Sequence, residues 1–169
     1  FLRAQKISVI YLQNITDIDD KIIARAQEEK TTISAIANRY TRIFKKNMRE
    51  ARVVSVNTYA PATKYIKEII NQVERLIEKG HAYKIENDGY YFDLSTFSDY
   101  GKLAKRTIEQ AEDGTSRIDE NPMKRNRGDF CLWKFSQPGD PKWKASFGSG
   151  RPGWHIEDTA ISEKFFGPQ

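Results

Sequence analysis

The first hydrophobic run of the chain is short and rich in β-branched residues. Residues 7–12 read Ile-Ser-Val-Ile-Tyr-Leu, which is typical of a buried parallel strand rather than of a half-exposed strand with alternating polarity. Polar residues follow from Asn14 to Asp17 and predict a turn. Apolar residues then recur at helical spacing up to about Lys30, which predicts a helix with Asp17 as its N-cap.

Two longer amphipathic patterns come next. The first is predicted to be a helix capped by Thr31 or Thr32, and its apolar face comprises Ile33, Ile36, Ala37, Tyr40, Phe44 and Met48. The second starts at Pro61 or Thr63 and continues to Gly80, a residue that readily takes the left-handed conformation at a helix end. Residues 57–61, between the two patterns, are predicted to form a loop.

The second half of the chain begins with a hairpin signal. Two aromatic-rich runs, 82–85 and 90–94, flank an Asp-Gly pair, which predicts a β-hairpin. Residues 95–129 are polar without a sustained period, and we expect a long, partly mobile surface excursion there. Residues 130–135 predict another buried strand.

A polar and aromatic stretch lies near the end of the chain. Residues 137–153 hold three prolines and four glycines and are predicted to form a loop, and residues 154–166 return to helical spacing. His155 and Asp158 are three residues apart at the predicted helix start, so they share a face. Such a pair could bind a metal ion or simply form a hydrogen bond.

Asn14 and Thr16 give the turn after the first strand a similar character. Ligands of open α/β sheets bind outside the carboxyl ends of the strands, where amide and hydroxyl groups can hydrogen-bond to them. The alternative is that Asn14 only stabilises the turn and the aspartates after it only cap a helix.

Composition narrows the class of protein. A chain of 169 residues with 12% aromatic residues can build a folded core, and no apolar run approaches the length of a membrane span. The single cysteine, Cys131, excludes an intrachain disulfide framework and indicates a reducing compartment such as the cytoplasm; we expect it to be buried. The net charge of +5 permits a polyanionic partner without requiring one.

Taken in order, segments along nearly the whole chain resemble the cysteinyl-tRNA synthetases, a family of class I aminoacyl-tRNA synthetases. The segments that carry the resemblance are Asn14–Ile22, Glu78–Tyr83, Phe92–Asp93, Tyr100–Leu103, Asp129–Phe130, Leu132–Lys134 and Arg151–Glu157. The last of these, Arg-Pro-Gly-Trp-His-Ile-Glu, is the most specific.

The resemblance implies an α/β fold that is part of a Rossmann-like nucleotide-binding catalytic domain. Residues 1–50 and 146–169 would belong to the catalytic core, and residues 51–145 would form a connecting helix and an inserted β-containing subdomain. The implied protein is a monomeric enzyme of which this chain is an internal fragment. The family's His-Ile-Gly-His motif would precede Phe1 and its Lys-Met-Ser-Lys-Ser loop would follow Gln169, so the piece alone is expected to be inactive.

The implied reaction is the ATP-dependent activation of L-cysteine to an adenylate, followed by transfer to tRNA(Cys). By position, Thr16 and Trp154 match residues that line the family's cysteine pocket, and His155 matches the neighbouring histidine. Asn14 completes the predicted substrate-binding set, and no catalytic residue is assigned within the chain. The resemblance also implies a zinc ion that takes the cysteine thiolate.

Asp158 departs from the family pattern, because a zinc-ligating cysteine usually stands at this position. A carboxylate can bind zinc, although it is a harder donor than a thiolate, and we expect Asp158 to serve as an oxygen ligand. Two other functions stay open. One is the related ligase that joins cysteine to an amino sugar in mycothiol synthesis; the other is a non-catalytic RNA-binding module that uses residues 124–127 and 142–144.

Overall fold

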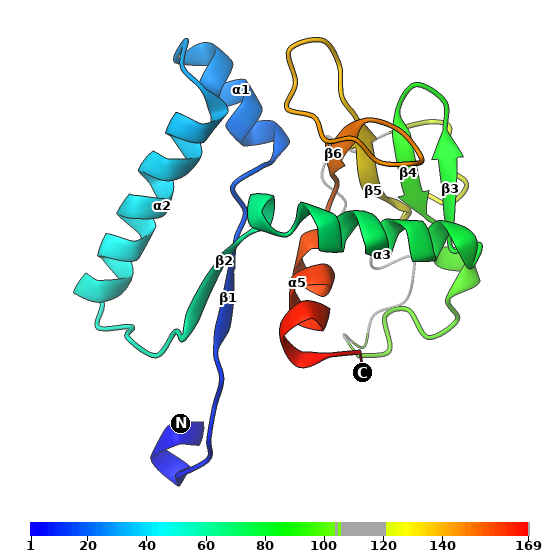
Figure 1. Cartoon of the computed structure of the whole chain (residues 1–169). Coiled ribbons are helices and arrows are strands. Elements are labelled where there is room, and N and C mark those ends of the chain that lie inside the picture. The colour runs from blue at the N-terminus through cyan, green and yellow to red at the C-terminus, as the bar shows by residue number, and fades with distance from the viewer. Residues whose placement is uncertain (104, 106–120, 169) are drawn as a thin grey trace. The chain divides into compact units, whose positions relative to one another are not determined.

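The computed structural model describes residues 1–103, 105 and 121–168, and the chain divides into two compact units. Unit 1 comprises Phe1–Tyr65 and Ile161–Gln169, and unit 2 comprises Ile66–Ala160. Both units combine helices with strands, so the predicted α/β class is confirmed (Figure 1). The elements in chain order are η1 (Leu2–Gln5), β1 (Leu12–Ile15), α1 (Asp20–Glu28), α2 (Ile33–Glu50), β2 (Thr58–Pro61), η2 (Ala62–Lys64), α3 (Ile66–Glu78), β3 (Ala82–Ile85), β4 (Gly89–Phe92), η3 (Leu94–Thr96), β5 (Phe130–Phe135), β6 (Gly150–Pro152) and α5 (Ile156–Phe166).

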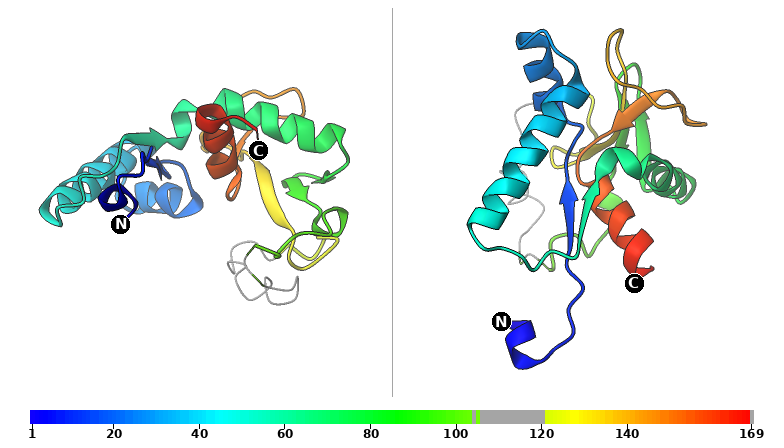
Figure 2. Two further views of the ribbon diagram at one scale, coloured as in Figure 1. Left: turned by 90° about the horizontal axis from the view of Figure 1, so that it is seen from below. Right: turned by 60° about the vertical axis from the view of Figure 1, so that its left-hand side comes forward.

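Unit 1 is built on two parallel strands, β1 and β2, which run side by side (Figure 2). Leu12 lies opposite Thr58 and Ile15 lies opposite Pro61. The prediction of a loop over residues 57–61 was therefore wrong. Four residues that end in proline give a weak strand signal, but a proline is tolerated at the edge of a ladder because no further N–H is needed there.

The first strand is parallel as predicted, but it spans Leu12–Ile15 rather than residues 7–12 and only Ile15 in it is buried, so the predictions of a buried run and of a turn that starts at Asn14 were wrong. Ile7 and Ile10 are exposed and lie outside the ladder. The Asn57 side chain explains the shift, because its Oδ1 accepts a hydrogen bond of 2.8 Å from the backbone N–H of Tyr11. The N–H of Tyr11 is therefore not available to extend the β1–β2 ladder toward the N-terminus.

Helices α1 and α2 form an antiparallel pair whose caps are polar side chains. Asp19, not Asp17, is the N-cap of α1 and accepts a 2.7 Å hydrogen bond from the N–H of Lys21, so the predicted cap was wrong. Thr32 caps α2 as predicted. The Glu29 carboxylate then ties the helices together by accepting hydrogen bonds from both Arg25 and Arg39, each as short as 2.6 Å.

Unit 2 is an antiparallel sheet in the order β3-β4-β5-β6, with α3 along it (Figure 1). The predicted hairpin and the predicted strand over residues 130–135 are both confirmed. The predicted loop over residues 137–153 was wrong at its end, because residues 150–152 pair with β5 as strand β6. Helix α3 starts at Ile66, later than predicted, because Ala62–Lys64 forms a separate 3-10 turn, and it stops before Gly80, whose φ is 75°.

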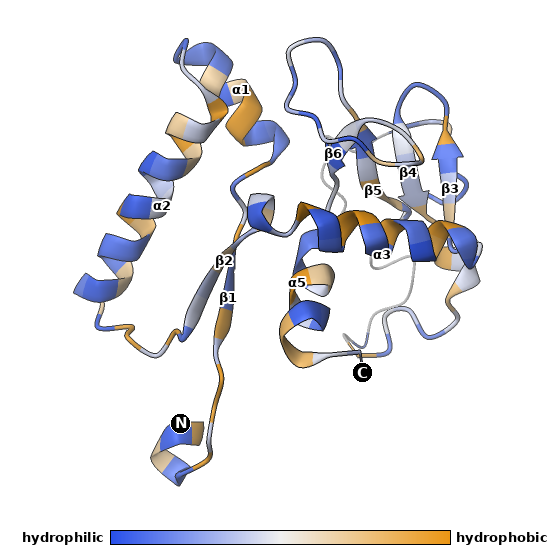
Figure 3. Cartoon of the chain, viewed as in Figure 1, coloured by the Kyte–Doolittle hydropathy of each residue, from blue (hydrophilic) through white to orange (hydrophobic). Residues whose placement is uncertain are grey.

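The core of unit 2 lies between α3, β5 and the start of α5. Its fully buried members include Ile69, Val73 and Trp133, each 0% exposed. The alternation of apolar and polar residues that buries one side of α3 is visible in Figure 3. Cys131 is 3% exposed, as predicted for a lone thiol.

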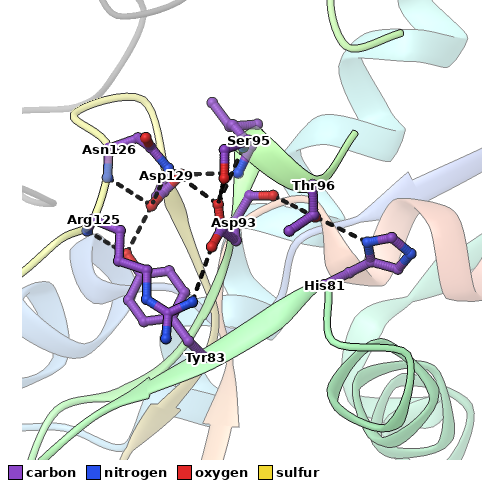
Figure 4. Close-up of polar contacts among 9 residues, drawn as sticks. His81, Tyr83, Asp93, Ser95, Thr96, Arg125, Asn126 and Asp129 are labelled. Atoms are coloured by element: carbon purple, nitrogen blue, oxygen red, sulfur yellow. Dashed lines mark hydrogen bonds and ion pairs between the residues drawn. The ribbon is translucent and has the colours of Figure 1, made fainter. Parts of the chain in front are cut away.

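A buried carboxylate fixes the chain as it enters β5. Asp129 is 0% exposed and accepts hydrogen bonds from the Tyr83 hydroxyl (2.8 Å), the Leu94 N–H (2.9 Å) and the Asn126 N–H (2.9 Å) (Figure 4). The predicted surface excursion was therefore wrong at its C-terminal end. Residues 104 and 106–120 of that segment lie outside the described residues.

Asp93 adds a second anchor to the same segment. Its carboxylate is bound by Ser95, by Asn126 and by the Arg125 guanidinium, whose nitrogen lies 3.0 Å away (Figure 4). Burial raises the pKa of Asp93, but the hydrogen bonds from Ser95 and Arg125 outweigh burial and leave the pKa below its ordinary value. The residues around Arg125 are thus held against the β3–β4 hairpin by two carboxylates.

We predict that Asp129→Asn destabilises unit 2 by about 3 kcal/mol, because the new amide would set an N–H group against donors that now find an acceptor. Hydrogen exchange of the β3 and β4 amides would measure the loss. Asp99→Asn, at an exposed position, should change the same free energy by less than about 0.5 kcal/mol. Equal protection in both variants would contradict this account of Asp129.

Candidate functional site

The carboxyl end of β1 opens into a pocket inside unit 1. The pocket has a volume of about 420 Å³, within the range of small-molecule sites. It is lined by Gln13, Asn14, Ile15, Thr16, Ile22, Ile36, Ala37, Tyr40, Thr41 and Phe44. Aliphatic and aromatic walls with a few hydroxyl and amide groups suit a small ligand that has both apolar and polar parts.

The turn that carries Thr16 is held by its neighbour, Asp17. The Asp17 carboxylate accepts one hydrogen bond from the N–H of Thr63 at 2.9 Å and another from the Thr63 hydroxyl. Thr63 lies just beyond β2, so this carboxylate joins the ends of the two parallel strands. Thr16 itself remains exposed at the pocket.

The second predicted stretch begins where β6 leaves the sheet of unit 2. The N–H of Gly153 donates to the Leu132 carbonyl at 2.8 Å, and the N–H of Trp154 donates to the Cys131 carbonyl at 2.7 Å. A Cβ on Gly153 would lie only 2.0 Å from that Cys131 oxygen, so only glycine fits there. The backbone is thus fixed while the Trp154 residue stays 37% exposed.

His155 stands just before α5 in a conformation that few L-residues adopt. Its φ is 60°, and the helix starts at Ile156 rather than at Trp154 as predicted. The left-handed backbone turns the chain between β6 and α5 and places the imidazole beside the Trp154 indole, with 4.7 Å between ring centroids. A left-handed non-glycine residue costs on the order of 1–3 kcal/mol and is often found at functional sites.

His155 and Asp158 lie next to one another, as their spacing predicted. Nδ1 of His155 is 3.3 Å from Oδ2 of Asp158. The hydrogen bond to Asp158 raises the pKa of His155, and burial only partly opposes this effect. The stabilisation is present below the ordinary histidine pKa of about 6.5 and is lost as the pH rises through the elevated value in the folded protein.

The described residues do not complete a metal site. Among residues 1–103, 105 and 121–168, no three His, Cys, Asp or Glu side chains gather closely enough to hold an ion. His155 and Asp158 offer two adjacent donors, whereas zinc sites in proteins take at least three protein ligands. Further ligands would have to come from outside the described residues.

The predicted site residues thus fall into two groups. Asn14 and Thr16 share one pocket in unit 1, while Trp154, His155 and Asp158 form a second cluster in unit 2. That the two groups line one cysteine pocket stays a prediction. Sequence reasoning missed the wall that α2 contributes to the pocket, because an apolar helical stripe reads as core, and it missed the bond from Asp17 to Thr63, because the partners are 46 residues apart.

Comparison with known proteins gives a consistent result along the whole chain. Residues 1–169 match the family model described as the tRNA synthetases class I (C) catalytic domain. The chain is 52% identical to a protein from Thermoplasma acidophilum named cysteine–tRNA ligase, over 99% of this chain and 37% of that protein. Proteins of the same name from Thermoplasma volcanium and Coxiella burnetii are 49% and 41% identical, over 100% and 99% of this chain and 37% and 36% of their own lengths.

These findings confirm the resemblance seen in the sequence and lend no support to the other two functions left open there. The chain spans little more than a third of the length of these relatives. None of the helices in the described part of the chain has the length and hydrophobicity needed to cross a bilayer.

We predict that Asp158→Asn lowers the pKa of His155 toward about 6.5, because it removes the hydrogen-bonded carboxylate that stabilises the imidazolium. A titration of the imidazole signals by nuclear magnetic resonance would follow the shift. Asp140→Asn, in the loop before β6, serves as the control and should leave the pKa of His155 in place. An unchanged pKa in Asp158→Asn would show that the contact is not formed in solution.

Proposed function

Because the chain belongs to the family of class I (C) tRNA synthetase catalytic domains, we propose that the whole protein attaches L-cysteine to tRNA(Cys). In the first step a carboxylate oxygen of cysteine attacks the α-phosphorus of ATP, and pyrophosphate leaves. In the second step a ribose hydroxyl at the 3′ end of the tRNA attacks the carbonyl carbon of the adenylate, and AMP leaves. The similarity of the entire chain to proteins named cysteine–tRNA ligase carries this proposal.

In this proposal, unit 1 supplies the part of the site that holds the amino acid. The Thr16 hydroxyl and the Asn14 amide lie on one pocket wall at the end of β1, where they could hydrogen-bond to the amino acid. Binding at such a fixed place positions the carboxylate for attack, and positioning is a large part of the work of enzymes that join two substrates. The bond from Asp17 to Thr63 keeps this turn in place.

Unit 2 supplies an aromatic surface and an ionisable group. The exposed face of Trp154 offers an apolar wall, and the raised pKa of His155 increases the fraction of imidazolium near neutral pH. An imidazolium could stabilise negative charge on a carboxylate or a phosphate during adenylate formation. We assign His155 this electrostatic role as part of the proposal.

A zinc ion would bind the cysteine thiolate and so distinguish cysteine from serine, because zinc has a strong affinity for thiolates. Asp158 would contribute one oxygen ligand, and the remaining ligands would come from elsewhere in the protein. The buried thiol of Cys131, the single cysteine of the sequence, fits the reducing cytoplasm in which translation takes place, which we propose as the location.

We predict that the full-length protein catalyses cysteine-dependent exchange of pyrophosphate into ATP, and that the 169-residue chain alone does not. Thr16→Val should lower kcat/KM for cysteine by roughly tenfold or more, which corresponds to the loss of about one hydrogen bond, and Thr16→Ser should retain most of the activity. Thr31→Val, outside the pocket, is the matched control. Exchange that depends on another amino acid, or on none, would overturn the proposed function.

We also predict that replacing Asp158 changes the metal content of the full-length protein. Asp158→Cys should raise zinc affinity because a thiolate is a stronger zinc ligand than a carboxylate, and Asp158→Ala should lower it. Mass spectrometry of bound metal, after equilibration with buffers of graded zinc concentration, would measure the order of zinc affinity among the two variants and the parent protein. Equal zinc in Asp158→Ala and the parent protein would remove Asp158 from the ligand set.

A further inference from the structure

The net positive charge of the chain is concentrated in one helix. Residues 33–52, which comprise α2 and the two residues after it, contain six cations and one carboxylate: Arg39, Arg42, Lys45, Lys46, Arg49, Arg52 and Glu50. Removing them from the totals of 28 cations and 23 carboxylates leaves 22 of each. The excess of +5 therefore belongs to this segment, and the remaining 149 residues are balanced.

The other long helices do not share this composition. Helix α1 has two cations and two carboxylates, α3 has two cations and three carboxylates, and α5 has one cation and three carboxylates. An ordinary solvent-facing helix mixes both signs in this way, because such pairs support the helix. A one-signed face repels itself unless an anion covers it, so α2 needs a different explanation.

Three of these cations line up on one side of α2. Arg42, Lys46 and Arg49 follow the i, i+4, i+7 spacing that places residues on one face, and all three are exposed. The buried residue Ile36 and the pocket-lining residue Phe44 lie on the other side. Polar residues recur along α2 in Figure 3, interrupted by apolar ones.

Most of this cationic face has no internal partner. In the part of the chain that the structure describes, Arg42 and Arg49 form no ion pair. Lys46 meets Glu50 at 3.6 Å, but both side chains are more than 60% exposed, and such pairs contribute little. Arg39 differs, because Glu29 binds it and so accounts for its position.

The helix dipole explains only some of these positions. Cations are favoured in the last turn of a helix, which accounts for Arg49 near the end of α2. The effect fades within that turn, and Arg42 lies in the middle of the 18-residue helix. The positive charge of Arg42 therefore receives little stabilisation from the helix dipole.

We propose that the face of α2 formed by Arg42, Lys46 and Arg49 binds the phosphate backbone of the tRNA. The identity of the partner rests on the proposed function, in which tRNA is the one large polyanion. Arginine guanidinium groups bind phosphate oxygens in a bidentate manner. Arg42 and Arg49 are seven residue steps apart, which is about 10 Å along the helix axis and matches about three phosphates at roughly 3.4 Å each along one strand of a duplex. Such contacts position the nucleic acid and do not read its sequence.

The test compares binding of a tRNA(Cys) transcript to the full-length protein and to its double variant Arg42→Gln/Arg49→Gln, over roughly 50–200 mM salt. Each lost phosphate contact should reduce the slope of log affinity against log salt by about 0.7–0.9. We expect the slope to fall by about 1.5 and Kd near 100 mM salt to rise roughly tenfold. The charge-conserving variant Arg42→Lys/Arg49→Lys should keep most of the slope, which separates loss of charge from damage to the helix.

A matched control removes two exposed cations elsewhere. Lys67→Gln/Lys79→Gln loses the same charge at two exposed positions, one in α3 and one just after it, and should leave both Kd and slope close to the parent values, because the proposal assigns the phosphate contacts to α2. Equal losses in the two glutamine variants, or no loss in either, would overturn the proposal. Cysteine-dependent pyrophosphate exchange is measured on the same proteins and needs no tRNA. If the parent protein shows no exchange, the proposed function is wrong, whereas the comparison of tRNA binding still tests the role of α2.

Discussion

The closeness of β6 to β5 is the constraint on which the second half of the structure depends. A side chain on Gly150 would put its Cβ 2.3 Å from the Lys134 carbonyl, and one on Gly153 would collide with the Cys131 carbonyl in the same way. Since neither glycine has a side chain, the chain lies flat against the sheet through Pro152 and emerges with Trp154 and His155 in fixed positions. The core around Trp133 packs beneath this strand, whose backbone path is determined by the two glycines.

Both candidate site regions follow the same design, in which hydrogen bonds fix a turn and leave some side chains on it exposed. In unit 1 the fixed turn follows β1 and is held through Asp17, and in unit 2 it follows β6 and is held by the carbonyls of Cys131 and Leu132. A side chain that is exposed on a rigid support can contact a ligand without first losing much conformational freedom in the backbone. Exposed polar residues such as Thr16 and His155 therefore have defined backbone positions, although their side chains pack little against the rest of the chain.

Local signals in the sequence were sufficient for the start of α2, for the end of α3 and for the hairpin. Thr32 caps α2, Gly80 ends α3 and the Asp-Gly pair turns between β3 and β4, and in each case the deciding interaction lies within a few residues. The strands β2 and β6 were missed because they are only four and three residues long and contain proline. Hydrogen-bonded pairing with β1 and with β5, rather than composition, makes these two segments strands.

The site shows the same division between local and distant causes. Asn14 and Thr16 could be proposed from their place after a strand, and the contact between His155 and Asp158 followed from helical spacing. The left-handed φ of His155 could not be predicted, because residues other than glycine seldom adopt it and the reason lies in the path from β6 to α5. The buried role of Asp129 was equally hidden, since its partner Tyr83 stands 46 residues earlier in the chain.

The bond between Asp17 and Thr63 also has a mechanical consequence. It makes the turns after β1 and β2 a single piece, although 46 residues separate them in the chain. Thr63 stands only three residues before Ile66, where α3 and unit 2 begin. A molecule that binds against Thr16 therefore contacts a turn that is tied directly to the chain at one of the two covalent junctions between the units.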